Sequence, residues 1–130
     1  MVNWNIIRLI LILTAQLGLK TKQVDYTAAF VHADIDKPPG YDEITPEQQR
    51  RQGVFIEMPR GFKQEGKVLK LKKSLYGLKQ SPRNFFNHLK TNLIKVGFEQ
   101  KVDVDPCLFI SDKVICITYV DDWLYYGRRG

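Results

Sequence analysis

Two neighbouring acids, Asp121 and Asp122, lie between two apolar runs near the end of this 130-residue sequence. Residues 114–118 are rich in β-branched side chains and residues 123–126 are aromatic, and both compositions favour β-strands. The pattern predicts a tight hairpin with carboxylates at its tip. Adjacent carboxylates repel each other unless a cation neutralises them, and Mg²⁺ suits such oxygen ligands. The alternative is an acidic surface turn without a ligand.

A third acid, Asp25, lies far upstream in the segment 23–30, which has the sequence QVDYTAAF. A short strand-like segment ends at this acid, and small residues suited to a turn follow it. A strand in the same sheet as the hairpin would bring Asp25 beside the hairpin tip. We therefore expect Asp25, Asp121 and Asp122 to converge.

Three segments in this order resemble the signature motifs of reverse transcriptases. Segment 23–30 resembles the first motif, segment 74–83 (SLYGLKQSPR) the second, and segment 119–122 (YVDD) the third. The sequences of these three segments resemble those of copia-type retrotransposon polymerases, and the resemblance runs from about Trp4 to the C-terminus. The chain thus resembles a fragment of a Pol polyprotein from the fingers and palm region. We expect the thumb, ribonuclease H, integrase and protease to be absent from it.

The resemblance implies an α+β fold in which an antiparallel sheet packs against helices and carries a YVDD hairpin. It also implies one partial reverse transcriptase domain over residues 1–130, consistent with a composition of 44% hydrophobic residues that can bury one core.

The implied chemistry is RNA-directed DNA synthesis by two-metal phosphoryl transfer. Asp25, Asp121 and Asp122 would hold two Mg²⁺ ions, with Mn²⁺ as an alternative, about 3.5–4 Å apart. By resemblance, the backbone carbonyl of Tyr26 is a further ion ligand. The implied partners are a primed RNA or DNA template and deoxynucleoside triphosphates, and Tyr119 is expected to contact the primer terminus.

The resemblance also assigns a nucleotide pocket. Phe30 matches the position whose ring lies under the incoming sugar and excludes a 2′-hydroxyl; the alternative is an ordinary core phenylalanine. Gly77 and Lys79 match a motif that lines the pocket for nucleotide and template. Tyr76 stands where retroviral relatives carry Gln.

Basic residues concentrate in the middle of a chain whose net charge is +6. Residues 60–95 contain ten Lys or Arg and one acid, Glu65. For one lysine, a solvated strand face is the simpler interpretation. The cluster favours contact with phosphates, because such patches supply most non-specific affinity for nucleic acid. We expect Lys70, Lys72, Lys73 and Arg83 to contact primer or template.

Patterns elsewhere predict the remaining elements. An apolar helix over residues 4–17, ended by Gly18, is expected to be buried, and the less favoured alternative is a signal peptide. Residues 37–53 are expected to form a surface insertion containing a short helix that begins with Thr45 and Pro46. A strand over 54–58 follows it. A further helix is predicted from Ser81, as N-cap, to about Val96, with one apolar stripe of Phe85, Phe86, Leu89, Leu93 and Val96.

The partner classes follow from the same features. The first helical run is too short to span a bilayer, so no membrane partner is expected. Cys107 and Cys116 lack CxxC spacing, which favours an intracellular compartment, either a cytoplasmic virus-like particle or the nucleus. Two other functional classes stay open: a non-catalytic nucleic-acid-binding remnant, and a small basic structural protein. Metal-dependent extension of a primed template separates polymerase from remnant.

Overall fold

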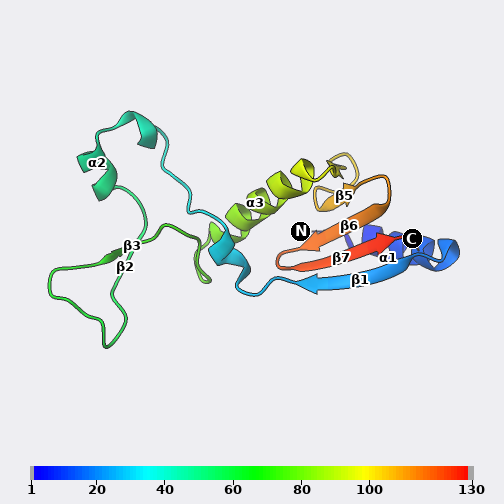
Figure 1. The fold of residues 1–130 in the computed structure, drawn as a ribbon, viewed down its shortest axis with the longest axis horizontal. Helices are drawn as coiled ribbons and strands as arrows, with labels where there is room; N and C mark the ends of the chain where they lie inside the picture. The colour runs from blue at the N-terminus through cyan, green and yellow to red at the C-terminus, as the bar shows by residue number, and fades with distance from the viewer. Residues whose placement is uncertain (1, 129–130) are drawn as a thin grey trace.

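A computed structural model describes residues 2–128 of the chain. Its centre is an antiparallel sheet with the strand order β1-β7-β6-β5-β4, and a separate two-stranded sheet pairs β2 with β3 (Figure 1). The elements are α1 (Trp4–Leu17), β1 (Lys20–Asp25), η1 (Ala29–His32), η2 (Tyr41–Glu43), α2 (Pro46–Arg51), β2 (Phe55–Ile56), β3 (Leu69–Lys70), α3 (Ser81–Lys95), β4 (Glu99–Gln100), β5 (Leu108–Ile110), β6 (Val114–Tyr119) and β7 (Asp122–Gly127). The expected α+β class is confirmed.

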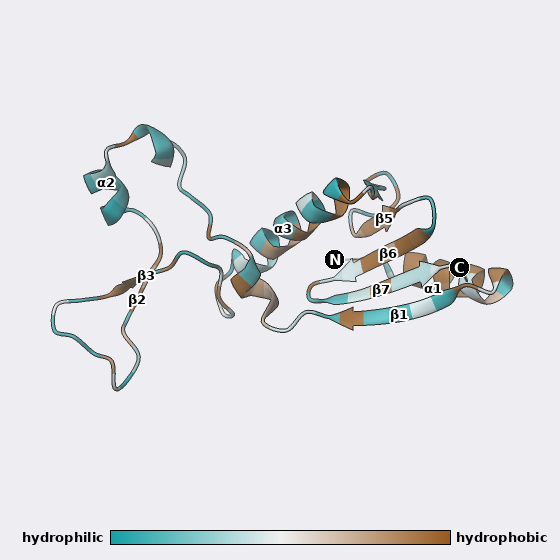
Figure 2. Ribbon diagram, viewed as in Figure 1, coloured by the Kyte–Doolittle hydropathy of each residue, from teal (hydrophilic) through white to brown (hydrophobic). Residues whose placement is uncertain are grey.

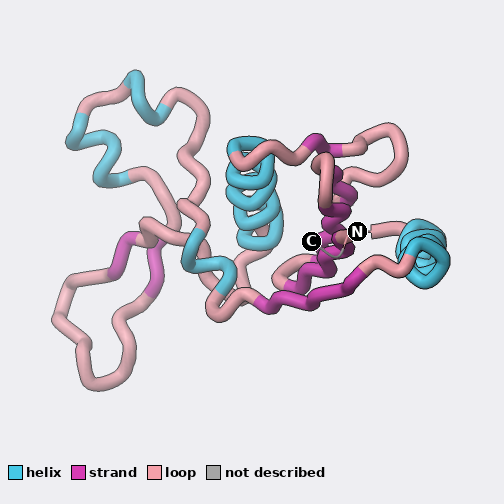
Figure 3. The backbone as a smooth tube through the Cα atoms, turned by 45° about the vertical axis from the view of Figure 1, so that its right-hand side comes forward, coloured by secondary structure: helices cyan, strands magenta, loops and turns pink. Residues whose placement is uncertain are grey.

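The strands β5, β6 and β7 are buried on both faces because their side chains alternate between two cores, whereas the edge strand β1 has no buried residue. Figure 3 shows the sheet between two helices, with α3 on one side and α1 on the other. The α3 side is formed by Ala29, Phe30, Ala33, Phe85, Leu89, Leu93, Phe109, Cys116 and Trp123. The α1 side is formed by Val2, Ile10, Cys107, Leu108, Ile117 and Tyr126. This alternation fixes which residues of β7 face each helix.

Helix α1 has the predicted bounds, and Gly18 ends it in the left-handed conformation with φ 61°. The expectation that the helix is buried is wrong for much of its surface. Ile10 and Thr14 are buried, whereas Leu9 and Ile12 are about half exposed. The run is apolar on all sides, but only one side of the helix meets the sheet. None of the helices within residues 2–128 combines the length and apolar content needed to cross a bilayer.

Helix α3 begins as predicted but is capped differently. Ser81 is the first helical residue and is fully buried, and its hydroxyl donates to the Leu75 carbonyl. Gln80 holds the N-cap position without a side-chain hydrogen bond. The expected stripe is confirmed at its buried residues Phe85, Leu89 and Leu93, with Phe86 half-buried. It is wrong at Val96, which is exposed because it follows the last helical turn.

Residues 35–73, here called the extension, project away from the sheet and include η2, α2, β2 and β3 (Figure 1). The capping box predicted at Thr45 and Gln48 is present. The strand predicted over 54–58 shrinks to Phe55–Ile56, and its partner β3 is equally short. None of these described residues is buried. Figure 2 shows α2 as hydrophilic, in contrast with β6. Without an apolar face to cover, long strands gain little here.

Candidate active site

The β6–β7 hairpin places its two acids at one end of the main sheet. Tyr119 of β6 is the register partner of Asp122 of β7, so the connecting turn consists of Val120 and Asp121. Val120 has φ 53°, an uncommon conformation for a β-branched residue. Such local strain persists where surrounding structure holds it in place, and here both flanking strands are fully paired.

Strand β1 brings the distant acid to the same place. It pairs with β7 over its whole length, and Asp25 is the register partner of Asp122. The Tyr26 N–H donates to the Asp121 carbonyl at 3.2 Å, which fastens the chain after Asp25 to the turn. Because cross-strand partners share a sheet face, Asp25, Asp122 and Tyr119 lie on one face. Asp25 and Asp122 are exposed, and Asp121 is half-buried.

The donor chemistry of this end of the sheet suits Mg²⁺, which binds one or two carboxylates and keeps its other positions for water and phosphate. Within residues 2–128, however, no three Asp, Glu, His or Cys side chains lie close enough together to hold a metal ion. Asp25 and Asp122 are a cross-strand pair, with Asp121 beside them in the turn. Their roles as ion ligands stay a prediction.

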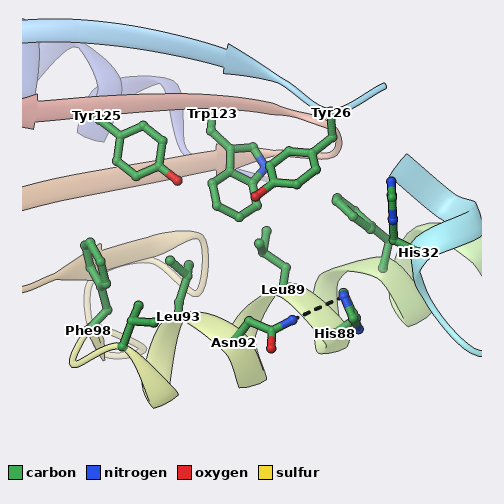
Figure 4. Close-up of a pocket in the computed structure, with 11 residues that line it drawn as sticks. Tyr26, His32, His88, Leu89, Asn92, Leu93, Phe98, Trp123 and Tyr125 are labelled. Atoms are coloured by element: carbon green, nitrogen blue, oxygen red, sulfur yellow. Dashed lines mark hydrogen bonds between the residues drawn. The ribbon is translucent and has the colours of Figure 1, made fainter. Parts of the chain in front are cut away.

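The residues that follow two of these acids line a cavity on the α3 side of the sheet. Tyr26 follows Asp25 and Trp123 follows Asp122, and their ring centroids lie 4.7 Å apart. The cavity is about 410 Å³ and lies between β7 and α3, with His32 and His88 also lining it (Figure 4). Trp123 is buried, and its indole Nε1 has no hydrogen-bond partner among the described residues. Packing on this side therefore supports the backbone that carries the acids.

Comparison with known proteins decides the family. A model of the family described as reverse transcriptase (RNA-dependent DNA polymerase) matches residues 1–129. The chain belongs to this reverse transcriptase family. It is 35% identical over 130 residues to the retrovirus-related Pol polyprotein from transposon TNT 1-94 of Nicotiana tabacum, an alignment that covers 94% of the chain and 9% of the relative.

Yeast relatives show the same relationship. The chain is 30% identical over 106 residues to the truncated transposon Ty1-A Gag-Pol polyprotein of Saccharomyces cerevisiae, covering 82% of the chain and 8% of the relative. The identity to the transposon Ty1-DR5 Gag-Pol polyprotein is also 30%, over 5% of that relative. This reverse transcriptase chain is thus of the copia-type retrotransposon Pol class and spans less than a tenth of these relatives. No solved structure matches it.

The predicted nucleotide-pocket residues of this reverse transcriptase chain lie on both sides of an aromatic contact. Phe30 is buried in the core on the α3 side, and its ring centroid lies 4.4 Å from that of Tyr76, which is largely exposed. Gly77 has φ 95°, a conformation that favours glycine. Lys79 is exposed. The pocket itself stays a prediction.

The predicted primer and template contacts are mostly engaged within the chain. Lys73 pairs with Asp34 and Arg83 with Asp36. The hydrogen bond and positive charge of Lys73 hold the pKa of Asp34 below its ordinary value. These acidic partners were missed, since 39 and 47 residues separate the pairs in sequence. The run of acids in residues 34–43 was the available signal.

Lys70 makes its contacts within the extension. Its ammonium group donates to the Gln49 carbonyl and to the Tyr41 hydroxyl, and it lies 5.2 Å from the centroid of the Tyr41 ring. This contact ties α2 to β3. Lys72 is exposed beside it.

The two cysteines are shielded from solvent, Cys116 in the core on the α3 side and Cys107 in the core on the α1 side. Cys116 of β6 is fully buried, and burial raises the pKa of its thiol to about 12. Burial also raises the pKa of the Cys107 thiol, with a further contribution from Asp105. Both are free thiols, and their protonated state at neutral pH makes them poor nucleophiles.

Proposed function

We propose that this chain supplies the polymerase centre of a retrotransposon reverse transcriptase, which extends a primer 3′-hydroxyl by one deoxynucleotide at a time. The observation that carries the proposal is the β1–β7 register, which sets Asp25 opposite Asp122 next to the turn residue Asp121. Three acids from two distant motifs therefore meet at one end of a sheet. Like charges this close repel each other, and bound cations would relieve that repulsion.

In this proposal Asp25, Asp121 and Asp122, with the Tyr26 carbonyl, hold two Mg²⁺ ions. When bound, the ions lower the pKa of the 3′-hydroxyl and neutralise the triphosphate and leaving group. The chain contributes negative charge at fixed positions, since Asp25 and Asp122 belong to paired strands and Asp121 lies in the two-residue turn next to Asp122. Tyr119 shares their sheet face and is proposed to contact the primer terminus.

The proposed sugar selection depends on Phe30. Its buried position and its contact with Tyr76 hold the ring in one place, which a steric filter requires. Replacement of Phe30 by Val would open space for a 2′-hydroxyl, the group that distinguishes ribonucleotides from deoxynucleotides. The ratio of ribonucleotide to deoxynucleotide incorporation measures this, and an unchanged ratio would assign Phe30 to the core alone.

Template and primer are proposed to bind the basic surface that includes Lys70, Lys72, Lys73 and Arg83. Either RNA or DNA suits it, because phosphates and not bases are recognised. The place of action is proposed to be a cytoplasmic virus-like particle or the nucleus.

A binding-only remnant is the second candidate. One observation favours it: the described residues contain no closed group of three metal-ligating side chains. It predicts salt-dependent nucleic-acid binding without primer extension when Mg²⁺ is supplied.

Primer extension in a longer polypeptide that restores the remaining Pol segments tests the two candidates. Asp25→Asn and Asp121→Asn should each abolish incorporation, and Asp122→Asn should remove most of it, because each lowers the charge that balances the ions. Asp112→Asn is the control, since this exposed acid lies on the β5–β6 turn. Near-normal extension by the Asp121 variant would contradict the catalytic proposal.

The 130-residue chain alone is expected to bind primed template weakly without measurable polymerisation. Positioning of substrates supplies much of the rate in phosphoryl transfer, and this chain spans less than a tenth of its relatives. Processive DNA synthesis by the isolated chain would contradict this expectation.

A further inference from the structure

Two basic side chains proposed to contact nucleic acid are each bound to a carboxylate of the same short segment. The Lys73 ammonium group lies 2.5 Å from Asp34 Oδ1, and the Arg83 guanidinium lies 2.5 Å from Asp36 Oδ2. A carboxylate and a phosphate present similar anionic oxygens to Lys and Arg. The two acids therefore fill positions that phosphate oxygens would otherwise take.

Backbone hydrogen bonds hold this acidic segment against the second motif. The Ile35 N–H donates to the Lys72 carbonyl at 3.1 Å, and the Ser74 N–H donates to the Ala33 carbonyl at 2.9 Å. Asp34 and Lys73 form an isolated antiparallel bridge. Only the side chains of Asp34 and Asp36 need to move for Lys73 and Arg83 to be released.

The ion pairs themselves are open to solvent and easily exchanged. Side-chain exposure is 83% for Asp34 and 52% for Lys73, and 33% for Asp36 and 70% for Arg83. Exposed ion pairs contribute little to stability. Asp34, Asp36 and Arg83 also line an open groove of about 720 Å³ along α3, together with Lys95. An incoming anion can reach both pairs without unfolding any element.

We propose that Asp34 and Asp36 are intramolecular substitutes for phosphates, and that a polynucleotide binds this surface by displacing both carboxylates from Lys73 and Arg83. The inference rests on the proposed binding of nucleic acid and adds a specificity rule to it. A polynucleotide presents successive phosphates that replace two carboxylates in one binding event. A single phosphate replaces only one carboxylate, so its binding gains little free energy.

The rule has a measurable consequence in salt dependence. When a phosphate binds a free lysine or arginine, about 0.7 counterions leave a single strand. In the wild type, each displaced carboxylate attracts cations again, which offsets part of the release at that position. Removing both carboxylates should make the slope of log affinity against log salt steeper, by at most about 1.4.

The experiment measures binding of a fluorescein-labelled single-stranded oligodeoxynucleotide to the chain by anisotropy, over a series of NaCl concentrations. The variant is Asp34→Asn with Asp36→Asn, which keeps side-chain shape. The control is Asp103→Asn with Asp112→Asn, a double variant with the same net charge. Both acids are exposed and lie in loops that follow the second motif in the sequence. Circular dichroism checks that each protein is folded.

The Asp34/Asp36 variant should bind roughly tenfold more tightly near 0.1 M salt with the steeper slope, whereas the control should change far less. Adding Lys73→Gln and Arg83→Gln to the variant should reduce the slope again, to the wild-type value or below it. Equal changes in variant and control, or no change in either, would overturn the inference while leaving nucleic-acid binding intact. Failure of all the proteins, wild type included, to bind would instead contradict the proposed function.

Discussion

The main sheet and the extension are stabilised in different ways. The sheet has buried side chains on both faces, with Phe109 and Cys116 fully inaccessible on the α3 side and Ile117 and Tyr126 covered on the other. The extension, residues 35–73, has no buried residue. It is held by surface contacts such as that of Lys70 with Gln49.

This difference gives the two regions different rigidity. Burial on both faces fixes the register of β5, β6 and β7, because a slip of one residue would exchange the two cores. The exposed edge strand β1 is held by its pairing with β7, which places Asp25 opposite Asp122. The extension has no such constraint, so its basic side chains can exchange partners at low cost. A rigid sheet is thus joined to an extension whose basic side chains can change partners.

Truncation of an aromatic side chain should give the largest difference in the free energy of unfolding between the two regions. Phe85 is 1% exposed in the core on the α3 side, and Phe62 is 73% exposed in the extension. Phe85→Ala should lower the free energy of unfolding by about 3–5 kcal/mol through lost burial and a cavity. Phe62→Ala should change it by less than about 0.5 kcal/mol. Urea denaturation followed by circular dichroism measures both, and similar losses would contradict the comparison.

The sequence predicted the parts of the fold that depend on local pattern. Helix α1, the capping box of α2 and the strand ending at Asp25 have their expected positions. The strand predicted over residues 54–58 was too long, because apolar residues favour an extended strand only where a buried face exists. Ser81 was expected to cap α3, but it donates to the Leu75 carbonyl instead.

The sequence predicted the three acids from short segments, and it predicted that a strand ending at Asp25 would lie beside the hairpin. The residue-by-residue register, with Asp25 opposite Asp122, depends on long-range strand pairing that no local pattern encodes. The partners of Lys73 and Arg83 were missed for a related reason. Charge patterning shows where acids and bases gather but not which of them meet after folding.

Removal of a hydrogen-bond acceptor should give the next largest difference in stability between the sheet region and the extension. Buried Asp105 accepts from the Asn3 N–H at 2.6 Å and from the Cys107 N–H at 2.8 Å. Asp105→Ala should lower the free energy of unfolding by about 2 kcal/mol, because two backbone donors lose their acceptor.

Thr45 offers the matched change in the extension. Thr45→Ala removes the capping box of α2 and should fray that helix by about 1 kcal/mol locally. The urea midpoint of the whole chain should not move, since α2 carries no buried residue. A shift of that midpoint equal to that of Asp105→Ala would show that the extension unfolds together with the sheet.

Relief of backbone strain in the hairpin turn should give the smallest change in the free energy of unfolding. Val120 adopts φ 53°, which Asn tolerates better than a β-branched residue. Val120→Asn should raise the free energy of unfolding by about 1 kcal/mol. Ile115→Val, a matched change within β6, should lower it instead. A lower melting temperature for Val120→Asn would show that packing of the valine outweighs its backbone strain.

The central claim is that the β1–β7 register makes one cation site from Asp25, Asp121 and Asp122. Paramagnetic broadening of backbone amide signals by Mn²⁺ in the isolated chain tests it most directly. Broadening should be centred on residues 25–26 and 120–123, should be lost in an Asp25→Asn, Asp122→Asn double variant, and should persist in Asp112→Asn. Broadening centred on the acids of residues 34–43, or unaffected by the double variant, would contradict the claim.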